Sequence, residues 1–584
     1  MGFPDIKSEE NAPLRITSEW EDGEIFRWYR DRAARSPDAI AIDTLQIRKE
    51  TVVGLPCHRF VLLYMRDRSV HRLDRRPDQR AVEVLVNTAV PTKDELLHDL
   101  DQTALDHIHK TTKHEIGLFL EGQVDIEVVL SACNAISIDK SACKYTFFEH
   151  NCFFFSWTIL MVASRSYLPY EVPAHDPISE RAASCIPRLA EFIVDEIVEI
   201  LLEFVIDALT VFRKKAGPSI HQGMHILART GWALPIDVLR FSWKQMFKAR
   251  LHFGLRKRLE AQISEMLKKT IVDLCRNALV HHNTPVLVDG HLWLNRLSVI
   301  LVPAIRTEMI HREKGAIFSA ISGGLGDIDP SEFAKGVVDP SLKFAFLGKR
   351  AAQFHAVWNA SLNGALKAAK DVVDCTEWVD WWKRWHHDFE DLEKQPDKSP
   401  EEIARDVAEH GRKCVRKHYE TVFDMTWNVA RDGALESAKA IVKETQGSMK
   451  HKEARDRMWC EIWAIWDDLW AEVHPGAREK AVDAMDRIVQ KMINTSVELI
   501  TSELGDSKVH FVLARIPGND LYDEIEESGN PHPSQDIQLA KENMNNETLQ
   551  EFMKKKMRRG IISEDKFEVV IDTMSSVWAQ VVKR

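Results

Sequence analysis

The chain has 584 residues, of which 45% are hydrophobic and 29% are charged, and its formal net charge at pH 7 is -11. This composition is typical of a soluble globular protein with about two to four domains. The acidic balance argues against general nucleic-acid binding, because such binding depends on neutralising phosphates with Lys and Arg. The most apolar run, 152–163, is too short to span a bilayer, so no transmembrane segment is predicted.

The cysteines indicate a reducing compartment. The chain has nine of them, widely scattered and without a CxxC pair. Disulfide frameworks and zinc clusters use paired, regularly spaced cysteines, so neither is predicted. Residues 1–24 are acidic and polar and lack the basic-then-apolar pattern of a signal peptide. We therefore expect a cytoplasmic protein.

Residues 1–175 have the pattern of one α+β domain with a small antiparallel sheet. The lead-in to about residue 50 is weakly patterned, with a short helix expected at 23–34. Two runs of strand composition around a short polar turn predict a β-hairpin of 57–65 and 70–76. The remaining elements expected here are a third strand at 81–90, a helix at 93–113, and either strand or helix at 124–138.

After Pro177 the pattern becomes helical throughout. Residues 178–505 predict a large, mainly α-helical array, and 506–584 predict a linker followed by C-terminal helices. The helical segments expected are 189–212, 235–269, 270–280, a series of long Trp- and Ala-rich helices to about 503, and 539–583. A Gly-rich break is expected at 322–327 and a polar loop at 518–534.

The helical part contains an internal repeat. Residues 354–373 match 423–442 at Phe, Trp-Asn, Gly-Ala-Leu, Ala-Lys and the final Val. Two related helical units indicate an array completed by stacking neighbours. Many tryptophans lie in this part, and four of them follow one helical stripe: Trp459, Trp463, Trp466 and Trp470. Core packing is the favoured interpretation of the stripe, and an aromatic ligand groove is the alternative.

Cys152 is the candidate nucleophile. It follows His150 and Asn151 and opens an apolar, aromatic run that predicts a buried helix. Unpaired backbone N–H groups and the positive end of the helix dipole meet at such a position, and both favour a thiolate. A buried cysteine that only packs as a small hydrophobe is the alternative interpretation.

A thiol nucleophile needs a base, and His58 at the start of the predicted hairpin is the candidate. A strand-borne His in HRFVLLYMRDRSVHRL, followed much later by the Asn-Cys step of EHNCFFFSWTIL, resembles the permuted papain-like fold of NlpC-type and lecithin:retinol acyltransferase-like thiol enzymes. The resemblance covers about residues 50–168. It implies a Cys152 nucleophile, a His58 base, and acyl-enzyme chemistry on an amide or ester.

The third catalytic member has two candidates on the second strand of the hairpin. In the acyltransferase-like group a second His on this strand lies opposite the first, which points to His71. If the turn centres on residues 67 and 68, however, residue 71 pairs with Tyr64, about 20 Å from His58. Asp74 and Asp78 are nearer, and a three-residue loop places both on the His58 face, so Asp74 ranks above His71.

The residues beside the nucleophile are candidates for positioning. His150 and Asn151 are each able to help hold an oxyanion or to fix the loop, while the Cys152 amide is the simpler oxyanion donor. No cofactor and no metal site is predicted. The His107, His109 and His114 spacing does not share one helical face.

The favoured function is a cysteine-dependent hydrolase or acyltransferase whose helical C-terminal region binds substrate or a protein partner. The alternative is a non-catalytic helical scaffold in which the Cys domain is structural. A minor alternative is a terpene-cyclase-like helical enzyme, for which Asp467 in DDLWAE would serve an Asp-rich metal site.

Overall fold

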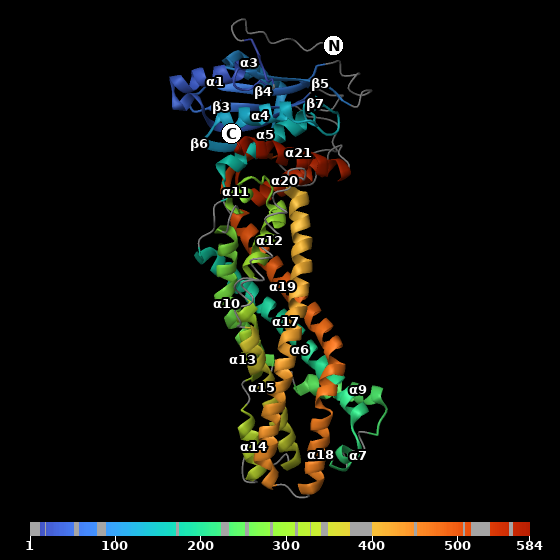
Figure 1. Cartoon of the computed structure of the whole chain (residues 1–584). Helices are drawn as coiled ribbons and strands as arrows, with labels where there is room; N and C mark the ends of the chain where they lie inside the picture. The colour runs from blue at the N-terminus through green and yellow to red at the C-terminus, as the bar shows by residue number, and fades with distance from the viewer. Residues whose placement is uncertain are drawn as a thin grey trace. The chain divides into compact units, whose positions relative to one another are not determined.

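The computed structural model describes residues 12–17, 19–51, 58–78, 89–170, 175–223, 233–250, 256–280, 284–309, 314–326, 329–339, 349–373, 400–448, 452–505, 508–515, 538–559 and 564–584 (Figure 1). The chain divides into two compact units. Unit 1 comprises Met1–Val172, Pro285–Ser298 and Thr501–Arg584, and unit 2 comprises Pro173–Thr284 and Val299–Ile500. An N-terminal antiparallel sheet and a large helical region are both present, as the sequence predicts.

Unit 1 is built on one antiparallel sheet. Its path is β1-β5-β4-β3-β2-β6-β8-β9, and β7 pairs with β5. The predicted hairpin is confirmed as β3–β4. The strands are β1 (Leu14–Arg15), β2 (Ala41–Glu50), β3 (Arg59–Met65), β4 (Val70–Pro77), β5 (Val90–Leu97), β6 (Thr112–Asp125), β7 (Lys144–Tyr145), β8 (Lys508–Arg515) and β9 (Gln538–Asn545).

The sheet is larger than the sequence pattern indicates. β2 lies in the stretch interpreted as weakly patterned, and the helix expected at 93–113 is wrong for its first part, where the chain forms β5. Both strands carry many charged residues, so their strand character depends on pairing partners on either side. The third strand expected at 81–90 lies, except for its last two residues, outside the described residues.

Helices cover both faces of this sheet. Figure 1 shows α4 (Ile126–Ile138), α5 (Cys152–Tyr167) and α21 (Glu564–Val582) on one side and α3 (Gln102–Thr111) on the other. The first side holds the main core, in which alternate strand residues such as Leu45, Val61 and Leu73 pack against α5. On the second side Ile108 of α3 packs on Phe60 and Leu62.

Three further sequence expectations are settled in unit 1. The helix expected near 23–34 is confirmed as α1 (Glu24–Arg35). The segment 124–138, left open between strand and helix, is helical as α4, and Asp125 caps it by accepting the Glu127 N–H. The helix expected at 539–583 is wrong at its start, because β9 precedes α20 (Asn546–Arg559) and α21. The loop expected at 518–534 lies outside the described residues.

Buried Arg165 fixes the segment 285–298 within unit 1. Its guanidinium lies 3.5 Å from the centre of the Tyr170 ring and donates to carbonyl groups of Asp289 and His291. It also pairs with the Asp289 carboxylate at 3.0 Å. These contacts hold α11 (Thr284–Asp289) and the short 3-10 helix Leu294–Arg296 against α5.

Unit 2 is helical among its described residues. Its helices are α6 (His175–Lys215), α7 (Pro218–Gly223), α9 (Ile236–Arg250), α10 (Arg256–Val280), α12 (Ser298–Glu308), α13 (Lys314–Gly326), α14 (Pro330–Val338), α15 (Lys349–Val373), α17 (Pro400–Thr445), α18 (Lys452–Ala464) and α19 (Trp466–Gly505). The expected Gly-rich break is wrong in part, since α13 continues to Gly326. Gly324 packs against Leu259 of α10, where an added Cβ would lie 2.6 Å from a Leu259 methyl.

The internal repeat forms a close helix crossing. Its copies lie on α15 and α17, and the matched glycines Gly364 and Gly433 face each other. A Cβ on either would fall within 3 Å of the other's carbonyl oxygen. The contacts at the aligned position four residues later are reciprocal, because Gly433 approaches Ala368 and Gly364 approaches Ser437. The two copies therefore pack around an approximate two-fold axis, with glycine required for the backbone approach.

The tryptophan stripe packs within the helical unit. Neighbouring rings from Trp459 to Trp470 lie 5.2, 5.8 and 6.1 Å apart. Trp459 belongs to the buried cluster around α15 and α17, and Trp470 contacts Trp427 at 4.7 Å. These contacts agree with core packing. Trp378, Trp381, Trp382 and Trp385 lie outside the described residues. Within the described part of the chain, no helix is long and apolar enough to cross a membrane.

Candidate active site

The register of the β3–β4 hairpin decides which side chains face His58. Leu63 pairs with His71 and Tyr64 with Val70. The loop is therefore three residues long, and it is closed by Met65 and Ser69 with Arg68 at a φ of 73°. The register with residue 71 opposite Tyr64 is wrong by one residue. Since strand side chains alternate, Asp74 lies on the His58 face and His71 on the opposite face.

His58 and Asp74 form a short, partly buried pair. His58 Nε2 lies 2.6 Å from Asp74 Oδ1, and the side chains are 17% and 7% exposed. Arg72 and Arg76 also donate to this carboxylate, at 2.5 and 3.2 Å. Burial alone would raise the pKa of Asp74, but the charges of Arg72 and His58 hold it well below its usual value. Asp74 is thus a carboxylate that orients the His58 ring.

Cys152 meets the other side of the same imidazole. Asn151 caps α5, with its Oδ1 accepting the N–H groups of Phe153 and Phe154, and this cap places Cys152 at the first position of the helix. The His58 ring and the Arg59 N–H lie near the Cys152 sulfur, and both lower the pKa of its thiol. Because Nε2 faces Asp74, Nδ1 is the ring nitrogen left for the thiol.

The electrostatics favour a thiolate beside an imidazolium. Burial alone would raise the pKa of the Cys152 thiol, but the hydrogen bond and charge of His58, with the Arg59 N–H, lower it below its ordinary value. Burial alone would lower the pKa of His58, but Asp74 and Cys152 raise it to about 10. Both shifts favour a proton on the imidazole and negative charge on the sulfur.

His71 is not part of this constellation. Its Nδ1 accepts the Asp99 N–H at 3.0 Å, and its Nε2 lies 3.2 Å from the Ser69 hydroxyl. The ring is fully buried and meets Trp28 edge-on. Burial and the nearby Arg32 lower the pKa of His71 to about 3, so it remains a neutral structural side chain. The sequence-based preference for Asp74 over His71 as the partner of His58 agrees with this geometry.

His150 and Asn151 fix the loop before α5. His150 points toward α21, where its Nε2 lies 3.2 Å from the Thr573 hydroxyl. Asn151 Nδ2 donates to the Phe147 carbonyl at 2.8 Å, while its oxygen serves as the helix cap. Both side chains are engaged in structural hydrogen bonds that hold the loop and the start of the helix.

Two residues at the site escaped the sequence analysis. Tyr145 lies near Cys152, and burial together with this neighbour raises the pKa of the Tyr145 hydroxyl. Arg75 is fully buried and donates to Asp94 and to main-chain carbonyls of the loop that leads to Cys152. For Arg75, the one sequence feature that could have indicated its role was its core-facing position on the second strand of the predicted hairpin. Tyr145 had no local signal, because tertiary structure brings it near the thiol.

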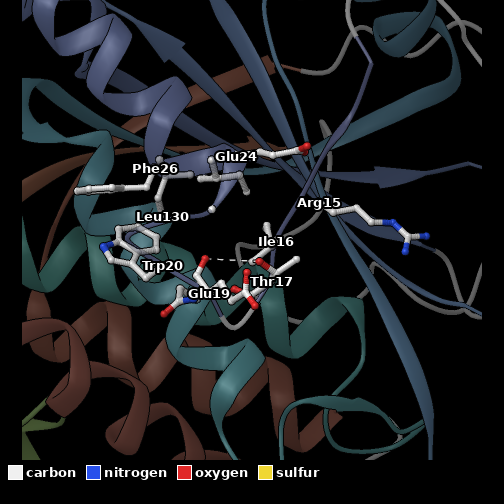
Figure 2. A pocket seen from close by; sticks show the side chains of 11 residues that line it. Arg15, Ile16, Thr17, Glu19, Trp20, Glu24, Phe26 and Leu130 are labelled. Carbon is white, nitrogen blue, oxygen red and sulfur yellow. Dashed lines mark hydrogen bonds between the residues drawn. The ribbon is translucent and has the colours of Figure 1, made fainter.

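Other candidate sites find less support. Among the described residues, no group of three or more His, Cys, Asp and Glu side chains is arranged to hold a metal ion. Asp467 and Asp468 are largely exposed and lie near Arg431 and Lys215. A pocket in unit 1 has no cysteine or histidine in its wall (Figure 2); it is lined by Arg15, Ile16, Thr17, Glu19, Trp20, Gly23, Glu24, Ile25, Phe26, Leu130 and Asn134.

We compared the chain with known proteins, and no family model, no curated protein and no solved structure matches it. The interpretation of the site therefore rests on its own geometry.

Proposed function

We propose that unit 1 is a cysteine-dependent hydrolase or acyltransferase that acts on an amide or ester through an acyl-enzyme at Cys152. The observation that carries this proposal is the continuous chain of contacts from the Cys152 thiol to the His58 ring and from there to Asp74. Each member has the protonation state that nucleophilic catalysis needs. The order of His58 before Cys152 along the chain is the order implied by the resemblance to permuted papain-like enzymes.

The proposed reaction follows from these states. The Cys152 thiolate attacks the acyl carbon, forming an S–C bond and moving the carbonyl electron pair onto oxygen. Collapse of this intermediate breaks the bond to the amine or alcohol, which takes its proton from the His58 imidazolium. Water or another hydroxyl or amine then loses a proton to His58 and attacks the thioester, which restores the thiolate. In this proposal the helical unit 2 serves substrate or partner binding.

Thiol labelling tests the proposal. The intact chain is treated with iodoacetamide between pH 5 and 9, and the alkylated cysteines are mapped by mass spectrometry. We expect Cys152 to be alkylated near neutral pH, and we expect His58→Ala to slow this by roughly 100-fold, because burial then disfavours the thiolate. Exposed Cys460 serves as the internal reference for reagent quality.

A second arm separates an enzyme from a scaffold. Incubation with p-nitrophenyl acetate should leave an acetyl thioester on Cys152, and Cys152→Ser should abolish it. If Cys152 is neither alkylated near neutral pH nor acylated while the chain remains folded, the non-catalytic scaffold becomes the better interpretation.

A further inference from the structure

The loop 142–151, which leads into the nucleophile, is held by a fully buried arginine. Arg75 donates from all three of its guanidinium nitrogens, and Nη1 pairs with the Asp94 carboxylate at 2.9 Å. The other two nitrogens donate to main-chain carbonyls of the loop, which belong to Ala142, Lys144 and, at 3.2 Å, His150. Because one planar group binds carbonyls at both ends of the loop, the loop has a fixed path into α5.

The ring of His150 is held separately, by the C-terminal helix α21. His150 is 2% exposed, and its Nε2 lies 3.2 Å from Thr573 Oγ. Thr573 donates its own hydroxyl proton to the Val569 carbonyl at 2.8 Å, so its oxygen accepts the N–H of the His150 ring. Next to this contact, Lys566 of α21 pairs with Glu149 at 3.2 Å. His150 is thus fixed at its carbonyl by β4 and at its ring by α21.

Strand β4 contacts both the proposed base and the loop of the nucleophile. Asp74 and Arg75 are consecutive residues of β4, so their side chains point to opposite faces of the sheet. Asp74 lies 2.6 Å from the His58 ring, while Arg75 binds the nucleophile loop. Only the helix cap lies between His150 and Cys152. One strand therefore sets the positions of the base and of the residue two before the nucleophile.

We propose that Arg75 and Thr573 are positioning residues: by holding His150 they keep the nucleophilic thiol within reach of its base. This inference rests on the proposed acyl-enzyme function, because that reaction requires the thiol and the imidazole to stay in contact. A buried ion pair such as that of Arg75 contributes little net stability compared with apolar side chains of the same volume. Its planar fork instead fixes several carbonyls at once, which the single ammonium of a lysine cannot do.

The test weakens each contact without removing a charge. Arg75→Lys keeps the positive charge beside Asp94 but loses the fork, and Thr573→Val removes only a hydroxyl. We expect acylation of Cys152 by p-nitrophenyl acetate to fall roughly 10- to 100-fold in Arg75→Lys and about threefold to tenfold in Thr573→Val. The rising limb of the pH profile of iodoacetamide alkylation at Cys152 should also move to higher pH, by about one unit in Arg75→Lys, because the sulfur lies farther from the imidazolium.

Matched controls separate positioning from stability. Arg165→Lys changes another buried arginine of unit 1, which pairs with Asp289 and donates to main-chain carbonyls but lies near the C-terminal end of α5. Ser575→Ala removes an α21 hydroxyl that donates to the Ile571 carbonyl of its own helix at 2.8 Å. Thr573→Ser keeps the hydroxyl that His150 contacts. All three controls should keep the wild-type acylation rate and the wild-type alkylation profile.

The outcomes distinguish this inference from the proposed function. If wild-type Cys152 does not acylate, the proposed function itself fails. If wild type acylates, a folded variant that keeps the wild-type rate and pH profile refutes the role of its residue, while the enzyme remains. A fall in acylation without a shift of the alkylation profile, or an equal fall in the matched control, also contradicts the inference. Should Arg75→Lys unfold, Thr573→Val decides by the same two measurements, because it releases the same histidine without changing the buried ion pair.

Discussion

The two histidines on opposite faces of the β3–β4 hairpin have pKa values shifted in opposite directions. On one face His58 lies 2.6 Å from a carboxylate and beside a thiol, and its pKa is raised to about 10. On the other face His71 is fully buried near Arg32, and its pKa is lowered to about 3. Both rings are buried on folding, so burial alone does not explain the difference between their pKa values. For His58 the charge and hydrogen bond of Asp74, together with Cys152, outweigh burial, whereas for His71 burial dominates and Arg32 adds to it.

This contrast explains why residue type alone does not identify a catalytic base. His71 has two satisfied ring nitrogens and is fixed between Ser69 and the Asp99 amide. His58 has a carboxylate behind it and a nucleophile in front of it, which is the arrangement that general acid–base chemistry needs. If this contrast is correct, matched substitutions beside His58 and beside His71 should differ in their effect on the acylation of Cys152.

The largest effect is expected for Asp74→Asn. Removing the carboxylate charge withdraws the support for the His58 imidazolium, and p-nitrophenyl acetate acylation of Cys152 should fall about 100- to 10,000-fold. The matched control is Asp67→Asn on the His71 side, where the carboxylate pairs with Arg32. Acylation should persist in this control. Equal losses in the two variants would mean that the faces do not differ in function.

The pH dependence of acylation should give the next largest effect. For an amide substrate, whose amine must be protonated to leave, the rate should rise as the Cys152 thiol ionises below its ordinary pKa and should fall near pH 10 as His58 loses that proton. The measurement is the initial acylation rate between pH 5 and 11. In His58→Ala the rising limb should move to higher pH, because burial raises the thiol pKa once its partner is gone. A rising limb that stays in place would contradict the ion pair.

The smallest effect concerns stability and His71. Its folded pKa of about 3 lies below the ordinary value of 6.5, so between these values the unfolded chain binds more protons than the folded chain. The contribution of His71 is thus fully present above pH 6.5 and is lost as the pH falls toward 3. In urea titrations at pH 5 and 7, wild type should lose more stability on acidification than His71→Gln.

The substitution His71→Gln also tests whether His71 contributes to the reactions of Cys152. Gln keeps a donor and an acceptor for Ser69 and Asp99, so the fold should survive. Alkylation and acylation of Cys152 should remain within about twofold of wild type, since the His71 ring contacts Ser69 and the Asp99 amide and not His58. If His71→Gln is folded but acylates much more slowly than wild type, His71 takes part in catalysis and the contrast is wrong.

Local sequence signals determined the parts of the site that depend on neighbouring residues in the chain. The Asn151 cap followed by an apolar run fixes where α5 begins, and therefore places Cys152 at a helix N-terminus. Two strand-like runs around a polar turn fix the hairpin that carries His58. Both features were predicted from the sequence, and both follow from capping and turn chemistry that acts over a few residues.

Tertiary structure decided the rest, because the deciding interactions join distant segments. A one-residue change of register moves every side chain of β4 to the other face, so pairing with β3 was needed to place Asp74 with His58 and His71 away from it. Charged strands such as β2 became strands only through partners on both sides. Buried Arg75 holds the loop before Cys152 through contacts with Asp94 and with carbonyls of residues 144 and 150, and no local pattern encodes contacts between such distant residues.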